Sequence, residues 1–497
     1  MNINRIVALG LPVVFAASLA SAQQASVPAS PDVLTYAPLT YAPPSAKDHR
    51  VVLKNGIVAY IIEDRALPLI SVQAIVRAGA WLEPASKEGL ARLTGAQMRA
   101  GGTKSLTAEQ FDERADFLAA QIGSSMGETS SSASLNCLAD NLDDSLKLFV
   151  EMLREPRFQE DRLKLAKDQI LQDKKKRNDE SADIEGREFS VLLYGDDHVS
   201  NKFSTEASIR SLTSADLKAF HDMYYYPANM ILAVSGSFTK ADMVKKLEEA
   251  FSGWPSPKRV VGLVPPGIKS AAPGFYRIQK DVNQGRVSVG LPTVMRTSPD
   301  IYALEIMNEI LGGSGFTSRI TKTVRSNEGL AYSAGSGISF GNFYPGRFRA
   351  AYQSKSSTVA YALQLVFDEI RKIRETQVTD EELVTIKNNI IQTFPSNFES
   401  KAQQAGTFAA DEYSKRDPLF WTTYRDKIQA VTAADIQRVA KQYLVPEKMI
   451  TLVVGNQAEI AKGDGKHDVT LEKIAGGKVT ELPLRDPMTM TMTMKRR

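Results

Sequence analysis

Apolar residues along the chain follow two periods, which predict where strands and helices lie. Between residues 50 and 62, two apolar β-branched runs flank Asn55-Gly56, a pair that favours a tight turn between antiparallel strands. Residues 68–77 have the composition of a further strand. Helical spacing follows at Leu142, Leu146, Phe149 and Met152. Strands and helices mixed within one stretch of chain indicate an α+β fold.

Capping signals mark later elements. Thr213 and Asp216 have the spacing of a capping box, which predicts a helix over residues 213–225. A strand is expected over residues 230–234, ending at Gly236. A long, strongly charged helix is expected over residues 159–177.

The pattern of residues 212–236 returns in residues 431–455 without a gap, at an offset of 219 positions. The cap residues, a proline and the apolar run before a glycine recur in register. Chance is a poor explanation for a shared helix cap, a shared proline after the helix and a shared strand. The sequence therefore indicates a tandem duplication. The same offset carries Ala91, in a helix expected at residues 89–98, to Ile310, in a counterpart helix expected at residues 302–311.

The duplication predicts two homologous α+β domains, each a mainly antiparallel sheet with clustered helices, which together form one half of a clamshell. The joint between them is rich in proline and glycine, as suits a linker. The expected segments are a signal peptide at 1–22, a flexible leader at 23–46, domains at 47–255 and 273–457, a linker at 256–272 and a tail at 458–497.

Composition narrows the functional classes. The chain has 497 residues and a net charge of +4, a small excess for this length that gives no case for nucleic-acid binding. Its single cysteine, Cys137, excludes an internal disulfide. Cys137 lies in a run with strand-like alternation, so we expect a buried apolar residue rather than a catalytic thiol.

The N-terminus has the features of a targeting segment. One arginine precedes a mainly apolar run, and Ala20-Ser21-Ala22 fits a cleavage site before Gln23. The apolar run is too short for a spanning helix, and no later run is long enough. We therefore expect an exported, periplasmic protein without a membrane span; the alternative is an uncleaved anchor.

Several motifs together resemble the pitrilysin/insulinase family of zinc peptidases, above all its short two-domain bacterial members and the related mitochondrial processing peptidase subunits. The motifs run in the family's order from about residue 47 to residue 455. They are Leu53-Lys54-Asn55-Gly56, Val76-Arg77-Ala78-Gly79-Ala80-Trp81-Leu82-Glu83-Pro84, Tyr225-Tyr226-Pro227-Ala228-Asn229-Met230, Gly312-Gly313-Ser314-Gly315-Phe316-Thr317-Ser318-Arg319 and Val324-Arg325-Ser326-Asn327-Glu328-Gly329-Leu330-Ala331-Tyr332-Ser333.

The family's zinc motif, H-x-x-E-H, is lost. Its two histidines and its glutamate fall on Arg92, Ala96 and Gly95, none of which can bind zinc or act as the general base. The resemblance places a third ligand, a glutamate in the family, at Asp173. One carboxylate without histidine partners is a poor zinc site, and Asp173 also suits a solvated helix face. As a hypothesis, Arg92 fills the vacated position and pairs with Asp173.

A second metal site is not expected. The four histidines do not stand at i, i+3 or i, i+4 to one another. His221 is expected to face the surface and His198 to lie in a polar loop. The sequence thus predicts no metal and no cofactor in this chain.

The second half retains a pair of residues that the resemblance connects with substrate. In two-subunit members of the family, the subunit without zinc supplies an arginine and a tyrosine that hold the substrate backbone. Arg325 and Tyr332 match that pair, and both side chains can donate hydrogen bonds to peptide carbonyls. A purely structural role is the alternative. The glycine-rich stretch 312–318 is expected to form a tight turn after a helix that ends at Leu311.

The resemblance therefore implies a non-catalytic, substrate-holding subunit of an exported heterodimeric zinc peptidase, inactive alone. A homologous partner subunit would supply zinc and the general base, and extended peptides would bind along a sheet edge. A stand-alone peptide-binding or scaffold protein is the alternative. An active peptidase with an unrecognised site has little support.

The tail carries weaker signals. Residues 469–471 and 479–484 could form short strands. Residues 488–497, in which methionine and threonine alternate before a basic end, are expected to fray.

Overall fold

The computed structural model of the chain describes residues 30, 33–34, 41–259 and 261–492. The expected signal peptide at 1–22 lies outside these residues. The chain divides into two compact units, Met1–Tyr41 and Ala42–Arg497, and everything below concerns the second unit. No helix in the described part of the chain is long and apolar enough to cross a membrane.

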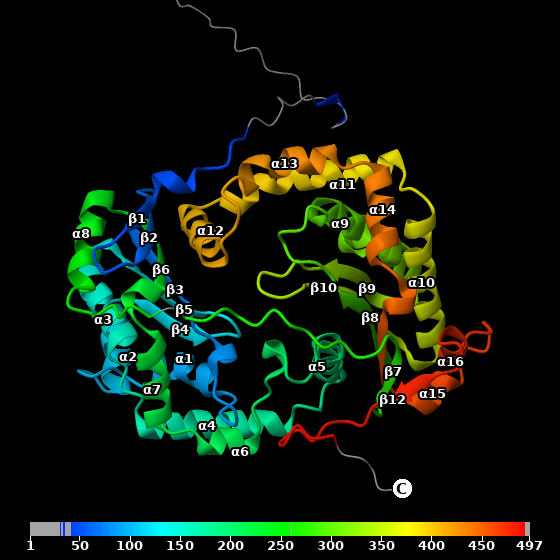
Figure 1. The fold of residues 1–497 in the computed structure, drawn as a ribbon, viewed down its shortest axis with the longest axis horizontal. Coiled ribbons are helices and arrows are strands. Elements are labelled where there is room, and N and C mark those ends of the chain that lie inside the picture. Colours follow the sequence, from blue (N-terminus) through cyan, green and yellow to red (C-terminus); the bar gives the residue numbers. More distant parts are fainter. Residues whose placement is uncertain (1–29, 31–32, 35–40, 260, 493–497) are drawn as a thin grey trace, which may run out of the picture. The chain divides into compact units, whose positions relative to one another are not determined.

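The first half of this unit is built on a six-stranded sheet of order β1-β2-β6-β3-β5-β4 (Figure 1). Only β2 and β6 pair in parallel. The predicted hairpin is confirmed, with Gly56 in the turn at φ +93°. The strands are β1 (Arg50–Val52), β2 (Val58–Glu63), β3 (Leu69–Val76), β4 (Gln121–Met126), β5 (Ser131–Leu138) and β6 (Met230–Gly236).

Apart from α5, the helices of the first half bury their apolar sides against this sheet and one another. The core includes Phe111, Phe149 and Leu217, all with no exposed surface. The helices are α1 (Leu90–Ala100), α2 (Ala108–Phe117), α3 (Leu142–Arg154), α4 (Glu160–Lys175), α5 (Ser181–Tyr194), α6 (Glu206–Ser211), α7 (Ser214–Tyr224) and α8 (Lys240–Ala250).

The second half repeats the plan with a sheet of order β12-β7-β11-β8-β10-β9. Its strands are β7 (Gly274–Gln279), β8 (Gln284–Pro292), β9 (Ala331–Ile338), β10 (Arg347–Lys355), β11 (Ile450–Gly455) and β12 (Val479–Glu481). Its helices are α9 (Ile301–Asn308), α10 (Val359–Glu375), α11 (Asp380–Thr393), α12 (Lys401–Ser414), α13 (Phe420–Ala430), α14 (Ala433–Tyr443), α15 (Gln457–Ala461) and α16 (Leu471–Ile474). The α+β prediction is confirmed.

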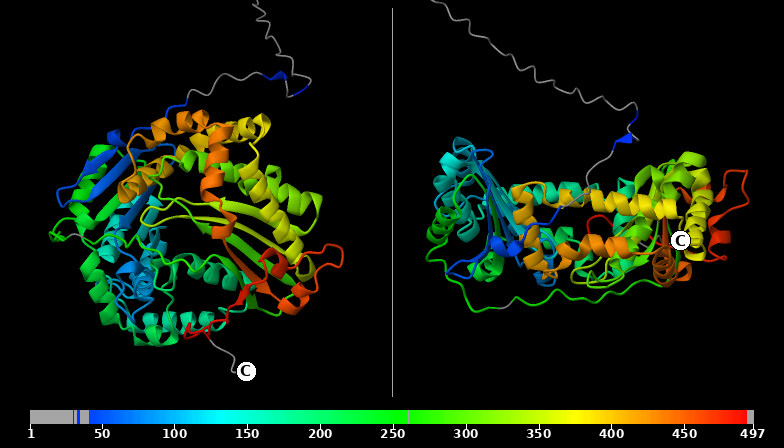
Figure 2. Two further views of the ribbon diagram at one scale, coloured as in Figure 1. Left: turned by 45° about the vertical axis from the view of Figure 1, so that its right-hand side comes forward. Right: turned by 90° about the horizontal axis from the view of Figure 1, so that it is seen from above.

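The local signals of the repeat are present in both halves. Capping boxes open α7 at Thr213 and α14 at Thr432, because each threonine accepts from the backbone N–H three residues on. The described residues between α8 and β7 contain no helix or strand and carry the chain from the first sheet to the second (Figure 2).

Each half gives one helix to the sheet of the other half. Helix α5 packs against β8 and β11 of the second sheet, and α12 packs against β2 and β6 of the first (Figure 1). The two helices correspond in the duplication, since the offset of 219 residues carries Tyr194 at the end of α5 to Tyr413 at the end of α12. The exchange explains why contacts join residues 42–497 into one compact unit.

Polar contacts fix both exchanged helices. On α5, the buried carboxylate of Glu185 pairs with Arg349 at 2.9 Å and accepts a hydrogen bond from Ser288. On α12, Glu412 pairs with Arg50 at 3.0 Å and accepts from the hydroxyl of Tyr60 at 2.8 Å. A buried charge left without its partner is costly, so Glu185 ties α5 to one position on the second sheet.

The tail departs from the expectation. Residues 469–471 lead into helix α16 rather than a strand, whereas β12 confirms the strand expected at 479–484. The described part of the expected frayed end is docked. Arg485 pairs with the buried Glu188 at 2.9 Å, and Met490 is 8% exposed. The partners of this tail lie about three hundred positions away in sequence, and local composition carries no signal for such contacts.

Substitution of Phe408 tests how much the exchanged helix α12 contributes to the stability of the fold. Its side chain is 2% exposed, and its ring lies 5.8 Å from that of Tyr60 in the other half. We expect Phe408→Ala to lower the free energy of unfolding by about 3–5 kcal/mol, because it opens a cavity between the halves. The measurement is urea denaturation followed by circular dichroism.

Phe117→Ala is the matched control. This phenylalanine on α2 is 77% exposed, so its truncation should change the free energy of unfolding by no more than about 0.5 kcal/mol. Equal effects of the two substitutions would contradict the role given to α12.

Candidate functional site

Helix α1 lies directly on β4, the edge strand of the first sheet. Gly95 is the point of closest approach, because a Cβ atom there would lie 2.4 Å from the backbone nitrogen of Met126. The hydroxyl of Ser124 donates to the carbonyl of Gly95 at 2.6 Å. The family's glutamate position is therefore filled by the edge strand itself, and no side chain can be added there without moving the strand.

Arg92 and Ala96 are exposed on the same helix. Their spacing of four residues places them on one face, where the family's two histidines would stand. A guanidinium group is permanently cationic and a methyl group has no donor atom. These residues do not fit a zinc ion. Among the described residues, no group of three His, Cys, Asp or Glu side chains is placed to hold a metal.

The hypothesis that Arg92 pairs with Asp173 is wrong. Asp173 is exposed on α4, and no ion pair joins the two within the described part of the chain. Arg92 instead lies near Lys174 and Arg177; burial lowers the pKa of both, and the charge of Arg92 adds to this effect. The side chain that the end of α4 buries toward the site is a lysine, one position after the aspartate that the resemblance indicated.

Lys174 is enclosed and hydrogen-bonded. It is 4% exposed, and its ammonium donates to the carbonyl and the hydroxyl of Ser204 at 2.6 Å each. Burial, followed by the charges of Arg177 and Arg92, lowers the pKa of Lys174 to about 7. The three basic side chains make the region of the lost motif electropositive.

Glu83 caps the start of α1, a role that sequence reasoning missed. The N-cap residue Gly89 has no side chain, so the helix takes an acceptor from elsewhere. One carboxyl oxygen of Glu83 accepts from the N–H groups of Gly89 at 3.1 Å and Ala91 at 2.7 Å. The other is buried without a partner in the described structure. Burial raises the pKa of Glu83 to about 7.

Two histidines are buried, each in its own setting. The surface position expected for His221 is wrong, since this residue is 2% exposed and its Nε2–H donates to the carbonyl of Leu153 at 2.8 Å. His198 is 6% exposed between Tyr194 and Tyr344, with ring centroids at 5.0 and 4.4 Å. Burial lowers the pKa of His198. The Nδ1 atom of His198 shares a hydrogen bond with the hydroxyl of Ser200 at 2.7 Å, and that of His221 lies 3.4 Å from the carboxylate of Asp222. Each ring is therefore held by contacts within its own part of the fold, which supports structural roles.

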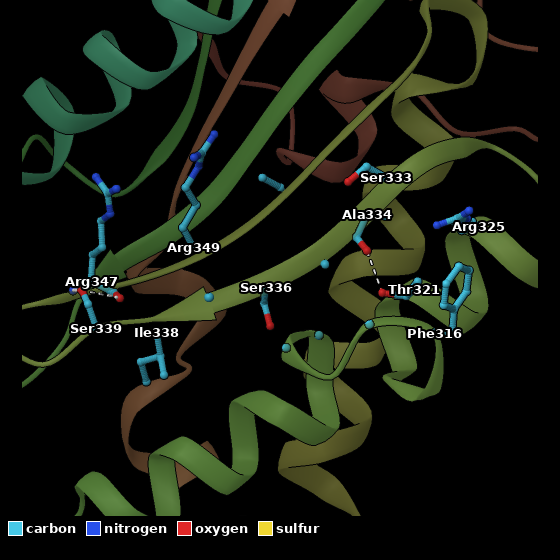
Figure 3. A pocket seen from close by; sticks show the side chains of 16 residues that line it. Phe316, Thr321, Arg325, Ser333, Ala334, Ser336, Ile338, Ser339, Arg347 and Arg349 are labelled. Carbon is cyan, nitrogen blue, oxygen red and sulfur yellow. Dashed lines mark hydrogen bonds between the residues drawn. The ribbon is translucent and has the colours of Figure 1, made fainter. Parts of the chain in front are cut away.

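In the second half, the structure brings Arg325 and Tyr332 together. Arg325 lies in a π-helical segment (Thr321–Asn327) and Tyr332 in β9. The guanidinium carbon lies 4.8 Å from the centre of the Tyr332 ring and 4.3 Å from that of Phe316. Figure 3 shows Phe316 beside Arg325. Sequence reasoning missed Phe316, although it stands in the glycine-rich stretch already noted.

This cluster of Phe316, Arg325 and Tyr332, here called the aromatic–arginine cluster, faces solvent. Phe316 is 66% and Tyr332 86% exposed. Large exposed aromatic rings are typical of binding surfaces. The two rings hold the guanidinium by cation–π contacts, while its N–H groups stay free to donate.

The glycine-rich stretch is a wider turn than expected. After α9 the helix continues as a π-helical turn (Glu309–Gly313) and ends in a short 3₁₀ turn (Gly315–Thr317). A Cβ atom on Gly312 would lie 2.3 Å from the backbone nitrogen of Ser336 in β9. Gly312 thus brings this turn onto the edge strand of the second sheet, as Gly95 brings α1 onto that of the first.

A cavity of about 590 Å³ opens on β9 and β10 beside the aromatic–arginine cluster. Figure 3 shows its polar lining, with Arg347 and Arg349 from β10, Arg325 on the far side, and the hydroxyls of Ser333 and Ser336. This lining can donate hydrogen bonds to carbonyl and carboxylate oxygens.

Comparisons with known proteins agree with this geometry. The family model described as "Peptidase M16 inactive domain" matches residues 211–390. "Non-peptidase homolog YmxG" of Helicobacter pylori is 23% identical over 417 residues, covering 83% of this chain and 95% of the relative. An "uncharacterized zinc protease" of Mycobacterium leprae is 25% identical over 305 residues, covering 57% of this chain and 67% of that protein.

Solved structures share the fold. A peptidase M16 inactive domain from Pseudomonas fluorescens superposes with a TM-score of 0.74 at 24% identity, covering 82% of this chain and 97% of that one. The periplasmic protease PqqL from Escherichia coli reaches 0.71 at 16% identity, covering 83% of this chain and 46% of its own. The resemblance found in the sequence is confirmed.

Gly95 allows a direct test of the contact between α1 and β4. We expect Gly95→Ala to lower the free energy of unfolding by about 2 kcal/mol, because its methyl group would overlap the backbone at Met126. Gly186→Ala is the control. Gly186 lies within α5, where an added Cβ atom would meet no heavy atom within 4 Å, so alanine there should stabilise by about 0.5–1 kcal/mol. Thermal unfolding measures both, and a stable Gly95→Ala protein would contradict the close approach.

Glu83 predicts a pH dependence of stability. The unfolded carboxyl ionises near 4.5, while the folded one keeps its proton to about pH 7. The unfolded state therefore binds fewer protons between these values, and stability falls as pH rises. Relative to Glu83→Gln, the protein should lose about 3 kcal/mol between pH 5 and pH 8. Denaturant titrations of both proteins across this range measure the difference, and parallel profiles would refute it.

Proposed function

We propose that the chain, of which residues 211–390 match the family model described as "Peptidase M16 inactive domain", is the substrate-holding subunit of an exported heterodimeric peptidase. A homologous partner would supply zinc and the general base. The observation that carries the proposal is the contrast between the halves. Gly95 is closed against β4 and Arg92 is cationic, while the aromatic–arginine cluster of the second half is assembled and exposed.

The cluster suits a role in holding a peptide backbone. A guanidinium group offers several N–H donors in one plane and a tyrosine offers an O–H donor. Peptide carbonyls accept from both, and a carbonyl that gains negative charge during hydrolysis accepts more strongly. The cation–π contacts hold Arg325 in place before a peptide arrives, which lowers the entropy lost on binding.

The edge strand β9 supports binding in an extended form. It is the last strand of its sheet and pairs only with β10 among the described strands. A peptide laid along its open edge can pair with the free backbone groups, a mode that depends little on sequence. Tyr332 lies on this strand, so the backbone and the cluster would act on the same peptide.

Export rests on the N-terminal pattern of charge, apolar run and cleavage site. The likeness of the fold to a periplasmic protease is in keeping with it. A stand-alone peptide-binding protein is the second candidate, supported by the relative described as a non-peptidase homolog. Co-purification of a zinc-bearing homologue from the source cells separates the two.

Reconstitution tests the role of Arg325. We expect the purified chain to cleave no peptide alone and to support cleavage when mixed with a homologue that carries H-x-x-E-H. Arg325→Ala in this chain should lower kcat/KM of the mixture by roughly 100-fold, because it removes donors to the reacting carbonyl. A fluorogenic peptide assay gives the rates.

Lys478→Ala is the control, since Lys478 is an exposed residue of the tail and should leave the rate unchanged. The assigned role is wrong if Arg325→Ala cleaves as fast as this control. Stoichiometric, tightly bound zinc in the isolated chain would overturn the whole proposal, and metal analysis of the same preparation measures it.

A further inference from the structure

The exchanged helices leave the same part of each sheet uncovered. Helix α5 lies over β8 and β11, and the strands beyond β8 on one side of the sheet are β10 and the edge strand β9. In the first half, α12 lies over β2, β6 and β3, and the strands beyond β3 are β5 and the edge strand β4. Cavities open on both uncovered faces, of about 590 Å³ on the second sheet and about 460 Å³ on the first.

The two cavities have different charge. The cavity on the first sheet is lined by Gln73, Ser125, Ser132 and Ser134 among other uncharged residues. The cavity on the second sheet is lined by three arginines, Arg325, Arg347 and Arg349, with no aspartate or glutamate in its lining. Because the halves share one fold, the positive charge is a property of these residues and not of the architecture.

Two of the three arginines have no carboxylate partner in the described structure. Arg349 pairs with Glu185 and donates to Ser288 at 2.7 Å. Arg347 and Arg325 form no ion pair within the described residues. Glu128, which lines a neighbouring cavity with Arg347, instead accepts a hydrogen bond from Tyr344 at 3.0 Å. The cavity therefore holds positive charge that a ligand can neutralise.

The pairing of β9 with β10 leaves the arginine side chains of this cavity accessible from the open edge of the sheet. Arg349 on β10 is opposite Gly337 on β9, and Ala351 is opposite Gly335. Side chains of paired residues point to the same face, so the glycines leave the space between the open edge and the arginines empty. A peptide added along β9 would direct every second side chain to this face, about 7 Å apart.

We propose that the uncovered face of β9 and β10 binds extended peptides that carry carboxylate side chains at alternate positions, with Arg347 and Arg325 as their partners. The inference rests on the proposed function, since it names the class of peptide that the same subunit would hold. The serine-lined face of the first half would tolerate neutral side chains. The preference for acidic peptides would arise in the second half alone.

Peptide binding to the isolated full-length chain tests the inference. The probes are three fluorescein-labelled decapeptides of one sequence with glutamate, glutamine or lysine at alternate positions. We expect the glutamate peptide to bind about tenfold more tightly than the glutamine peptide at low salt, and the lysine peptide to bind most weakly. The preference should shrink as salt screens the charges. Fluorescence anisotropy gives the affinities.

Matched variants separate a local effect from net charge. Arg347→Gln should weaken the glutamate peptide about fivefold and leave the glutamine peptide unchanged, while Arg347→Lys should retain most of the preference. Lys355→Gln removes one charge from the exposed end of the same strand and should change neither affinity. Equal binding of the glutamate and glutamine peptides, or equal effects of Arg347→Gln and Lys355→Gln, would overturn the inference.

Cleavage by the reconstituted mixture distinguishes failure of the inference about acidic peptides from failure of the proposed function. If cleavage of the glutamine peptide depends on Arg325 while the isolated chain shows no acidic preference, only the inference is wrong. If no peptide binds the chain and no mixture cleaves, both are wrong.

Discussion

The exchange of α5 and α12 is the constraint on which the arrangement of both halves depends. Each sheet is completed on its inner face by a helix from the other half, through apolar contacts such as Phe408 against Tyr60 and through the buried pair of Glu185 and Arg349. Removing either helix would expose the apolar side chains that it covers and would break its ion pair with the other half. Because each exchanged helix covers only the central strands, the exchange also determines which strands remain open for ligands.

The close approach of a helix to each edge strand is the second constraint, and it shapes the two halves differently. Gly95 and Gly312 occupy comparable places against β4 and β9. In the first half this contact fills the position of the family's glutamate, so histidines at Arg92 and Ala96 alone would not restore a zinc peptidase. In the second half the same kind of contact places Phe316 next to Arg325 and Tyr332. The same kind of helix-to-strand contact thus closes the position of the lost zinc motif in the first half and assembles the aromatic–arginine cluster in the second.

Local sequence signals predicted much of the fold, and contacts between distant residues account for what they missed. The hairpin at Gly56 and the caps at Thr213 and Thr432 depend on neighbours within four residues, and all three are confirmed. The burial of His221, the cap supplied by Glu83 and the docked tail at Arg485 depend on other partners. The pattern of apolar and polar residues along the sequence does not predict those distant partners. The resemblance identified the Arg325 and Tyr332 pair, but only the structure shows that their side chains meet.

The region of the lost motif remains positive without a metal ligand. Arg92, Lys174 and Arg177 lie close together, and like charges in a partly buried place repel strongly. Burial, with the charges of Arg177 and Arg92, lowers the pKa of Lys174 to about 7, and its ammonium donates to Ser204. Lowering the pH would protonate Lys174 in place and raise the repulsion on Arg92. An anionic group near Arg92 would oppose that repulsion, so the end of α4 favours negative charge at the position where the family holds a cation.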